Sequence, residues 1–203
     1  MKRSFSSQGP SAKKFAPWFN ALEESLKDPA LRVFEDDQIT IIRDKFPKAR
    51  FHYLALAKSP IDDLEQLTSA HVSLLEHLIE EAHAFVESNV AAKTKNPVRL
   101  GFHQVPSMKR LHLHIISQDF DSACLKHKKH WNSFTTPFFM DAEKVLTTLK
   151  EKGKVALDKS RAEELLKDPL RCHVCKESLA TIPKLKDHIK MHDKDEAVKE
   201  PKQ

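Results

Sequence analysis

The feature that most constrains this chain is a set of two cysteines and two histidines in the stretch RCHVCKESLATIPKLKDHIKMH. Cys172 and Cys175 enclose two residues, His188 and His192 enclose three, and twelve residues separate the pairs. Two thiolates and two neutral imidazoles form a closed tetrahedral zinc site, and histidines four apart share one helical face. A redox Cys-x-x-Cys pair is the alternative, but the downstream histidines argue against it. The spacing therefore predicts a small ββα zinc finger that holds a structural zinc ion.

The residues inside this finger indicate how it is built and what it contacts. Leu179 and Leu185 occupy the apolar positions that a ββα finger needs, and His173 is a bystander between the cysteines. A single finger covers only about 3 base pairs, which is too few to address a DNA sequence. We expect Lys184 to contact DNA. A finger packed on the main domain, or one that binds protein, is the alternative.

Composition narrows the classes of protein further. The only other cysteine, Cys124, stands alone, so a disulfide framework is not expected and a reducing, intracellular compartment fits better. The N-terminal stretch has no apolar core of a signal peptide, and no apolar run is long enough for a membrane span. With 3 glycines, a glycine-rich phosphate loop is excluded. The net charge of +5 permits a polyanionic partner.

The order of the predicted elements indicates an α+β chain with one main core and a small appendage. A helix near Pro17 precedes strands in LRVFEDDQITIIRD and RFHYLALA, and a long helix in residues 61–90 precedes strands in VRLGFHQVP and KRLHLHIIS. The expected divisions are a flexible arm (1–16), a catalytic domain (17–150), a helical linker (151–168), the finger (169–193) and a disordered tail (194–203).

A second histidine group lies in RLHLHIIS, Arg110–Ser117. In a strand, His112 and His114 project from one face while Leu111 and Leu113 are buried on the other. His103 on the preceding strand and Ser107 in the turn can converge with them on one oxyanion. Histidines and a hydroxyl without acidic partners suit a phosphoryl group better than a metal. A pair of buried core histidines is the alternative, and a zinc site lacks an obvious third ligand.

These residues resemble the histidine-triad family of nucleotide hydrolases and transferases, whose signature is His-φ-His-φ-His-φ-φ. VFEDDQITIIRDKFPKARFHYLALA resembles that family's first hairpin. The continuation GFHQVPSMKRLHLHIISQDFDSACLKHKKHWNSF, followed by the finger, is similar to the family's DNA 5′-adenylate hydrolases. The resemblance covers roughly residues 17–193 and implies a histidine-triad fold. The first signature position is Arg110 rather than histidine, so His112 must be oriented differently, and His52 is expected to supply part of that support.

The resemblance also implies roles for single residues. His112 would be the nucleophile that takes AMP, His114 and Ser107 would hold the phosphoryl oxygens, and His103 would assist the leaving 5′-phosphate. The remaining implied contacts are those of Asp44 with the ribose, of Lys126, Lys129 and His130 with AMP or DNA phosphates, and of Trp18 with the terminal base pair. For the basic run KHKKH and for Trp18, a solvated surface and a packing residue are the alternatives.

The sequence thus predicts a monomeric nuclear DNA-repair enzyme that removes AMP from adenylated 5′-phosphate DNA ends and nicks, with no catalytic metal and no membrane partner. It leaves open the preferred lesion among 5′-adenylated DNA, RNA–DNA junctions and 3′-capped ends. One alternative is a general histidine-triad hydrolase or phosphoramidase for small adenosine nucleotides. The other is an inactive zinc-finger protein that binds nucleic acid, which Arg110 keeps open.

Overall fold

The computed structural model describes residues 21–197 and, for side chains, residues 21–192. Its centre is a six-stranded antiparallel sheet with the order β1-β2-β3-β5-β4-β6. The strands are β1 (Arg32–Glu35), β2 (Ile39–Arg43), β3 (His52–Ala57), β4 (Val98–His103), β5 (His112–Ser117) and β6 (Phe139–Asp141). The predicted α+β class is confirmed.

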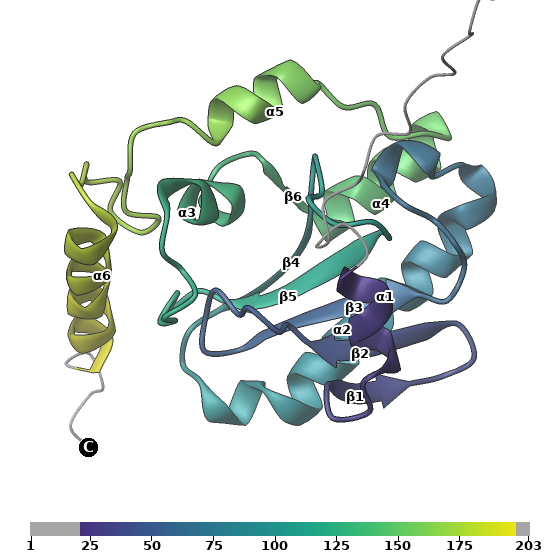
Figure 1. Ribbon diagram of the computed structural model, residues 1–203, viewed down its shortest axis with the longest axis horizontal. Coiled ribbons are helices and arrows are strands. Elements are labelled where there is room, and N and C mark those ends of the chain that lie inside the picture. The colour runs from purple at the N-terminus through teal and green to yellow at the C-terminus, as the bar shows by residue number, and fades with distance from the viewer. Residues whose placement is uncertain (1–20, 198–203) are drawn as a thin grey trace, which may run out of the picture.

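Within residues 21–197, six helices accompany the sheet (Figure 1). They are α1 (Ala21–Lys27), α2 (Val72–Asn89), α3 (Lys128–Thr135), α4 (Ala142–Lys152), α5 (Lys159–Leu165) and α6 (Ile182–Ala197). Single 3-10 turns occur at Leu64–Gln66, Ser69–His71 and Ala91–Lys93. No helix in the described range 21–197 has the length and apolarity needed to cross a membrane.

One face of the sheet forms the main apolar core with α2 and α4. Successive side chains of a strand point to opposite faces, so Leu113 and Ile115 of β5 lie on this side. They pack with Leu78 of α2 and Val145 of α4, and all four side chains are buried. This layer fixes the register of β5 and thereby directs His112 and His114 to the opposite face.

The opposite face carries two separate apolar groups with the histidines between them. Leu22 of α1 packs with Leu54 and Leu56 of β3 at one side. At the other side, Ile116 of β5 belongs to a cluster that joins α3 to the finger through Trp131 and Leu185, among others. A cleft therefore remains over the middle of the sheet, bordered by α3, by α5 and by the loop 105–108.

Several elements differ from the prediction. The long helix begins only at Val72, because residues 64–71 form two 3-10 turns instead. The basic run of residues 126–130 leads into a helix, α3, and β6 was not predicted. Arg110 precedes β5 in a left-handed conformation, with φ 78°, so it does not share the strand face of His112. The expected domain boundaries stay a prediction, and the arm 1–16 lies outside the described residues.

Candidate functional site

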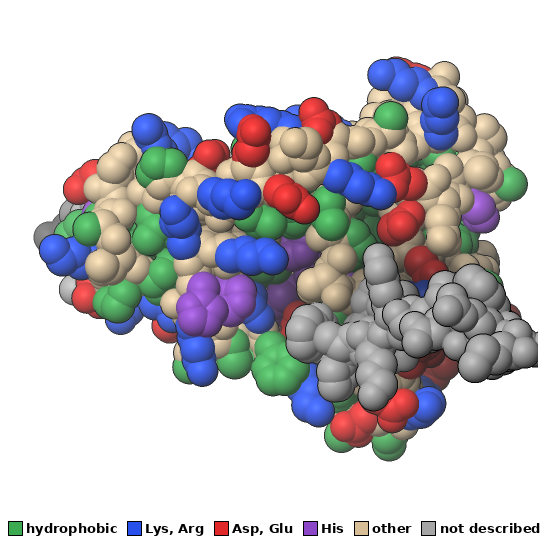
Figure 2. Space-filling model, turned by 45° about the horizontal axis from the view of Figure 1, so that its top comes forward, with side chains coloured by type: hydrophobic (Ala, Val, Ile, Leu, Met, Phe, Trp, Pro, Cys, Tyr) green, Lys and Arg blue, Asp and Glu red, His purple; other side chains and the backbone are tan. Residues whose placement is uncertain are grey.

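The cleft over the sheet has a volume of about 440 Å³, and most of the predicted site residues line it. On the face in Figure 2, histidine side chains lie partly recessed among Lys and Arg. Strands β3, β4 and β5, the loop 105–108 and helices α3 and α5 all contribute to the lining. The predicted residues among them are Asp44, His52, His103, Ser107, His112, His114, Lys129 and His130.

The backbone fixes the proton of His112. Its Nδ1 lies 2.7 Å from the carbonyl oxygen of Arg110, which can only accept a hydrogen bond. Nδ1 therefore carries the proton and Nε2 keeps its lone pair. Burial lowers the pKa of His112 below its usual value of 6.5, although the bond to Arg110 opposes this shift. A neutral imidazole with a free Nε2 is a nucleophile near pH 7.

A hydrogen-bond relay fixes the proton of His114 in the same way. The backbone N–H of Lys48 donates to Nδ1 of His52 at 3.1 Å, so the His52 proton must be on Nε2. That nitrogen lies 3.0 Å from Nδ1 of His114 and donates to it. His114 then carries its proton on Nε2, which is buried and has no partner in the described part of the chain. His114 therefore presents an N–H donor that needs an external acceptor.

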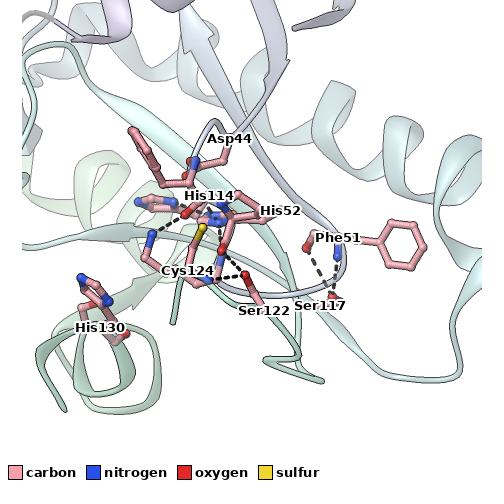
Figure 3. Close-up of polar contacts among 12 residues, drawn as sticks. Asp44, Phe51, His52, His114, Ser117, Ser122, Cys124 and His130 are labelled. Carbon is pink, nitrogen blue, oxygen red and sulfur yellow. Dashed lines mark hydrogen bonds and ion pairs between the residues drawn. The ribbon is translucent and has the colours of Figure 1, made fainter. Parts of the chain in front are cut away.

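The relay corrects one expectation from the sequence. His52 supports His114 rather than His112, because its Nε2 faces the His114 ring and not the nucleophile. Figure 3 shows His52 and His114 together beside Asp44. Burial lowers the pKa of His52 to about 4, against the nearby Asp44 carboxylate, so the ring is neutral at pH 7. Support for His112 comes from the carbonyl of Arg110 instead.

His103 is a further neutral histidine in the cleft. Its ring lies 4.3 Å from that of His114, measured between centroids, and it also contacts Phe134. Burial, followed by repulsion from His112, lowers the pKa of His103 well below its usual value, while a hydrogen bond to the Ser133 backbone opposes this shift. Its Nε2 is buried without a partner among the described residues. Both nitrogens belong to cleft-lining side chains: His114 offers an N–H to an anion, whereas Nε2 of neutral His103 keeps a lone pair that can take up a proton.

Asp44 is placed where it can serve a ligand or a metal. One carboxylate oxygen accepts from the N–H of Phe46 at 2.6 Å, and the other lies 3.4 Å from Nδ1 of His52. Asp44, His52 and His114 are close enough to hold a cation, so the structure supplies the third ligand that the sequence lacked. However, the facing nitrogens of His52 and His114 share a proton in a normal hydrogen bond. Because these two nitrogens point at each other, their lone pairs cannot both point at a metal ion.

The structure adds cleft residues that the sequence did not indicate. Lys48 reaches the cleft from the connection between β2 and β3. Glu163 reaches it from α5, and Leu166 is the residue that follows α5. Burial lowers the pKa of Lys48, and burial together with the Lys48 charge lowers the pKa of His130 to about 4. The helical pattern of α5 was visible, but no sequence signal indicated that it faces the histidines.

Three predicted DNA-contacting residues do not line this cleft. Lys126 lines a separate groove of about 400 Å³ between the loop 123–126 and α6, together with Lys186 and Lys190. Lys184 is exposed on α6 and lines neither opening. Trp18 lies outside the described residues. A basic surface thus extends from Lys129 at the cleft to the finger.

The four finger residues form a compact metal centre. Sγ of Cys172 lies 3.4 Å from Nε2 of His192, and Sγ of Cys175 lies 3.1 Å from Nε2 of His188. The two Nε2 atoms are 3.2 Å apart. Tetrahedral zinc bonds of about 2.0–2.3 Å place ligand atoms roughly 3.3–3.8 Å apart. The three separations lie within or about 0.2 Å below this range, so a small adjustment of the side chains fits them to a zinc ion. Nδ1 of His188 lies 3.5 Å from the Glu177 carboxylate, which can orient the ring.

The finger is packed tightly against the main domain. Trp131 donates from Nε1 to the carbonyl of Arg171 at 2.9 Å, and His173 packs against the rings of Trp131 and Phe120. Leu185 of α6 is buried in the same cluster. His173 is not part of the metal-binding group, as expected, and it contributes to the interface instead. The β part of the finger is a single bridge between Arg171 and Ser178 in place of two strands.

Comparisons with known proteins agree with this architecture. Residues 17–130 match the family described as the C-terminal binding domain of the scavenger mRNA decapping enzyme, and residues 135–195 match the C2HE / C2H2 / C2HC zinc-binding finger. The chain is 50% identical to aprataxin of Danio rerio over 91% of its own length and 56% of that protein. It is 30% identical to the aprataxin-like protein of Saccharomyces cerevisiae, over 83% of this chain and 89% of that one.

A solved structure gives the same result. The aprataxin ortholog Hnt3, in a crystal structure with DNA, matches with a TM-score of 0.70 at 27% identity, over 87% of this chain and 93% of that chain. Fold and site together define a histidine-triad protein with an attached zinc finger. The chain belongs to the aprataxin family, which confirms the resemblance read from the sequence. It spans about half the length of the animal aprataxins that it matches.

Proposed function

We propose that this protein hydrolyses adenylated 5′-phosphate DNA ends, releasing AMP through a covalent intermediate on His112. One observation supports this most directly: the Arg110 carbonyl holds the proton on Nδ1 of His112 and leaves the Nε2 lone pair free beside the Nε2–H of His114. A nucleophile and an aimed donor within one cleft are what nucleotidyl transfer requires.

The reaction has two steps with the phosphorus of AMP as the common centre. In the first, Nε2 of His112 attacks phosphorus, and the bond to the bridging oxygen breaks, so the DNA 5′-phosphate leaves with the electron pair. In the second, water attacks phosphorus and gives a proton to neutral His103, the N–P bond breaks, and its electrons return to Nε2 of His112 as AMP departs. Each step is an in-line displacement that the protein assists mainly by positioning and electrostatics.

Neutral donors stabilise the phosphoryl oxygens in both steps. His114 donates from Nε2, and Ser107 at the cleft rim adds a hydroxyl donor. His103 is neutral in the free protein, because burial lowers its pKa. An anionic substrate beside it opposes that shift, so His103 can take up a proton and pass it to the leaving phosphate. Asp44 holds the ribose hydroxyls, and Lys129 and His130 contact phosphates.

The DNA is proposed to run from the cleft to the finger. Three basic residues support this: Lys129 lines the cleft, Lys126 lines the groove beside α6, and Lys184 is exposed on α6. The related ortholog Hnt3 was also crystallised with DNA. The zinc ion is structural, since all four ligands come from side chains and no position is open. We also propose that the protein acts as a monomer. A DNA substrate supports a nuclear location.

The test is release of AMP from a nicked duplex with a 5′-adenylate, in EDTA and without added metal. We expect turnover by the wild-type protein and none by the His112→Ala variant. A small adenosine phosphoramidate serves as the competing substrate. A higher kcat/KM on that compound would favour the general nucleotide hydrolase, and no turnover of either substrate by folded protein would favour a binding protein.

A further inference from the structure

Arg110 has a backbone conformation that its residue type disfavours. Its φ of 78° lies in the left-handed region, where the Cβ atom crowds the backbone and glycine is the usual residue. A glycine would adopt this φ without strain, yet the chain has an arginine at this position. Such a residue persists only when the surrounding structure holds it in place.

The side chain of Arg110 provides that hold. Its guanidinium donates to the Glu23 carboxylate at 3.0 Å, to the carbonyl of Ala57 at 2.5 Å and to the carbonyl of Lys58 at 3.3 Å. The side chain is only 15% exposed. It therefore points away from the cleft and joins the end of β3 to α1. A planar guanidinium can span several acceptors at once, which an ammonium group cannot.

The backbone on both sides of Arg110 completes the arrangement. The next N–H, of Leu111, donates to the carbonyl of Ile61 at 2.7 Å. The carbonyl of Arg110 itself accepts from Nδ1 of His112 at 2.7 Å. Side chain and neighbouring amide thus fix the direction of a single carbonyl, and that carbonyl decides which nitrogen of His112 keeps its lone pair.

We propose that Arg110 is a positioning residue for the nucleophile, whose guanidinium locks a left-handed peptide so that its carbonyl holds His112 in the Nε2-nucleophilic tautomer. The inference rests on the proposed function, since it assigns His112 the attack. It also explains how the chain works without a histidine at the first signature position. Because Glu23 belongs to α1, the same contacts tie the placement of that helix to the nucleophile.

The test compares Arg110→Ala with a matched control. Arg32 of β1 also links the sheet to α1, by donating to the carbonyl of Leu26, and it pairs with Glu35 of its own strand; neither of these two partners is a histidine. We expect Arg110→Ala to lower kcat by about tenfold to a hundredfold with little change in KM, as for a displaced reacting group. We expect Arg32→Ala to leave kcat within about twofold. Arg110→Lys keeps the charge but loses the planar guanidinium, so its kcat should lie between those of the wild type and Arg110→Ala.

A spectroscopic readout separates positioning from mere stability. Nitrogen NMR of the resting protein should show a protonated Nδ1 and an unprotonated Nε2 on His112 in the wild type, and mixed tautomers in Arg110→Ala. If Arg110→Ala does not fold, the same measurement on Arg110→Lys and Glu23→Gln decides, with a partial loss of the single tautomer expected. An unchanged tautomer and an unchanged kcat in folded variants would overturn the proposal. This readout needs no turnover, so it stays distinct from failure of the proposed function.

Discussion

The two pairs of histidines, one on a strand and one on a helix, use the same side chain in opposite ways. His112 and His114 are two residues apart on β5, so their rings lie side by side but bond different partners. His188 and His192 are four apart on α6, and their Nε2 atoms converge to 3.2 Å beside two thiolates. Spacing and partner chemistry together therefore separate a set of donors and nucleophiles from a set of metal ligands.

Removal of the nucleophile should have the largest effect and tests the catalytic role of the histidine pair on β5. His112→Ala should lower kcat on adenylated DNA by roughly a thousandfold or more, as removal of a covalent nucleophile does in other enzymes. The Kd for the DNA should change little, because His112 supplies no charge to the complex. Quenched-flow kinetics and fluorescence anisotropy measure the two quantities. Activity within about tenfold of the wild type would move the nucleophile elsewhere.

Removal of a finger ligand should act on stability and DNA binding instead. Cys175→Ser replaces an exposed zinc ligand, so the zinc content should fall from one ion per chain and the Tm should drop. We expect kcat/KM on adenylated DNA to fall through KM, while hydrolysis of a small adenosine phosphoramidate falls far less. Metal analysis, calorimetry and kinetics on both substrates give the result. An equal loss of kcat on both substrates would contradict separate roles for the two pairs.

A smaller effect is expected from the basic surface that joins the two regions. Each phosphate contact contributes about 0.9 to the slope of log K against log salt. Lys129→Ala should therefore flatten that slope by roughly one unit and weaken DNA binding at low salt. Lys152→Ala is the matched control, because this exposed lysine ends α4 on the other face of the sheet. An unchanged slope for Lys129→Ala would remove the cleft lysine from the DNA path.

The smallest effect concerns pH. Burial lowers the pKa of His112, so Nε2 stays unprotonated below the usual value of 6.5 and loses its lone pair only at still lower pH. On a small adenylate whose leaving group needs no proton from His103, we expect kcat/KM to stay flat from pH 8 to 6.5 and its acidic limb to have a midpoint below 6.5. A midpoint above 6.5 would indicate a charged neighbour or a different nucleophile.

The sequence predicted both histidine pairs because each follows a strict period. The alternation in residues 111–116 and the spacing of four in the finger are local patterns, and the structure reproduces both. The relay through His52 could not be predicted, since it depends on the register in which Leu54 of β3 faces His114 of β5. The hydrogen bond from His112 to the Arg110 carbonyl could not be predicted either, because the direction of that carbonyl depends on the left-handed conformation of Arg110.

Helix α3 shows a different limit of the sequence. Its eight residues begin with charged and polar side chains, so the sequence indicates a basic segment that contacts phosphates, with a solvated surface as the alternative, and gives no helical pattern. Trp131 and Phe134 are three apart and both buried, but two positions give too short a periodic pattern. Their burial depends on β5 and on the finger, which meet them only in the fold. The lining residues Lys48 and Glu163 likewise reach the cleft through tertiary packing.

The most direct test of the central assignment is mass spectrometry of a reaction quenched in denaturant at neutral pH during the first turnover. With 5′-adenylated DNA, we predict an AMP adduct on His112 alone, present in the wild type and absent from His112→Ala. The adduct should form at the rate of DNA 5′-phosphate release and decay at the rate of AMP release. Turnover with an adduct on another residue, or with none at any time before AMP appears, would contradict the account.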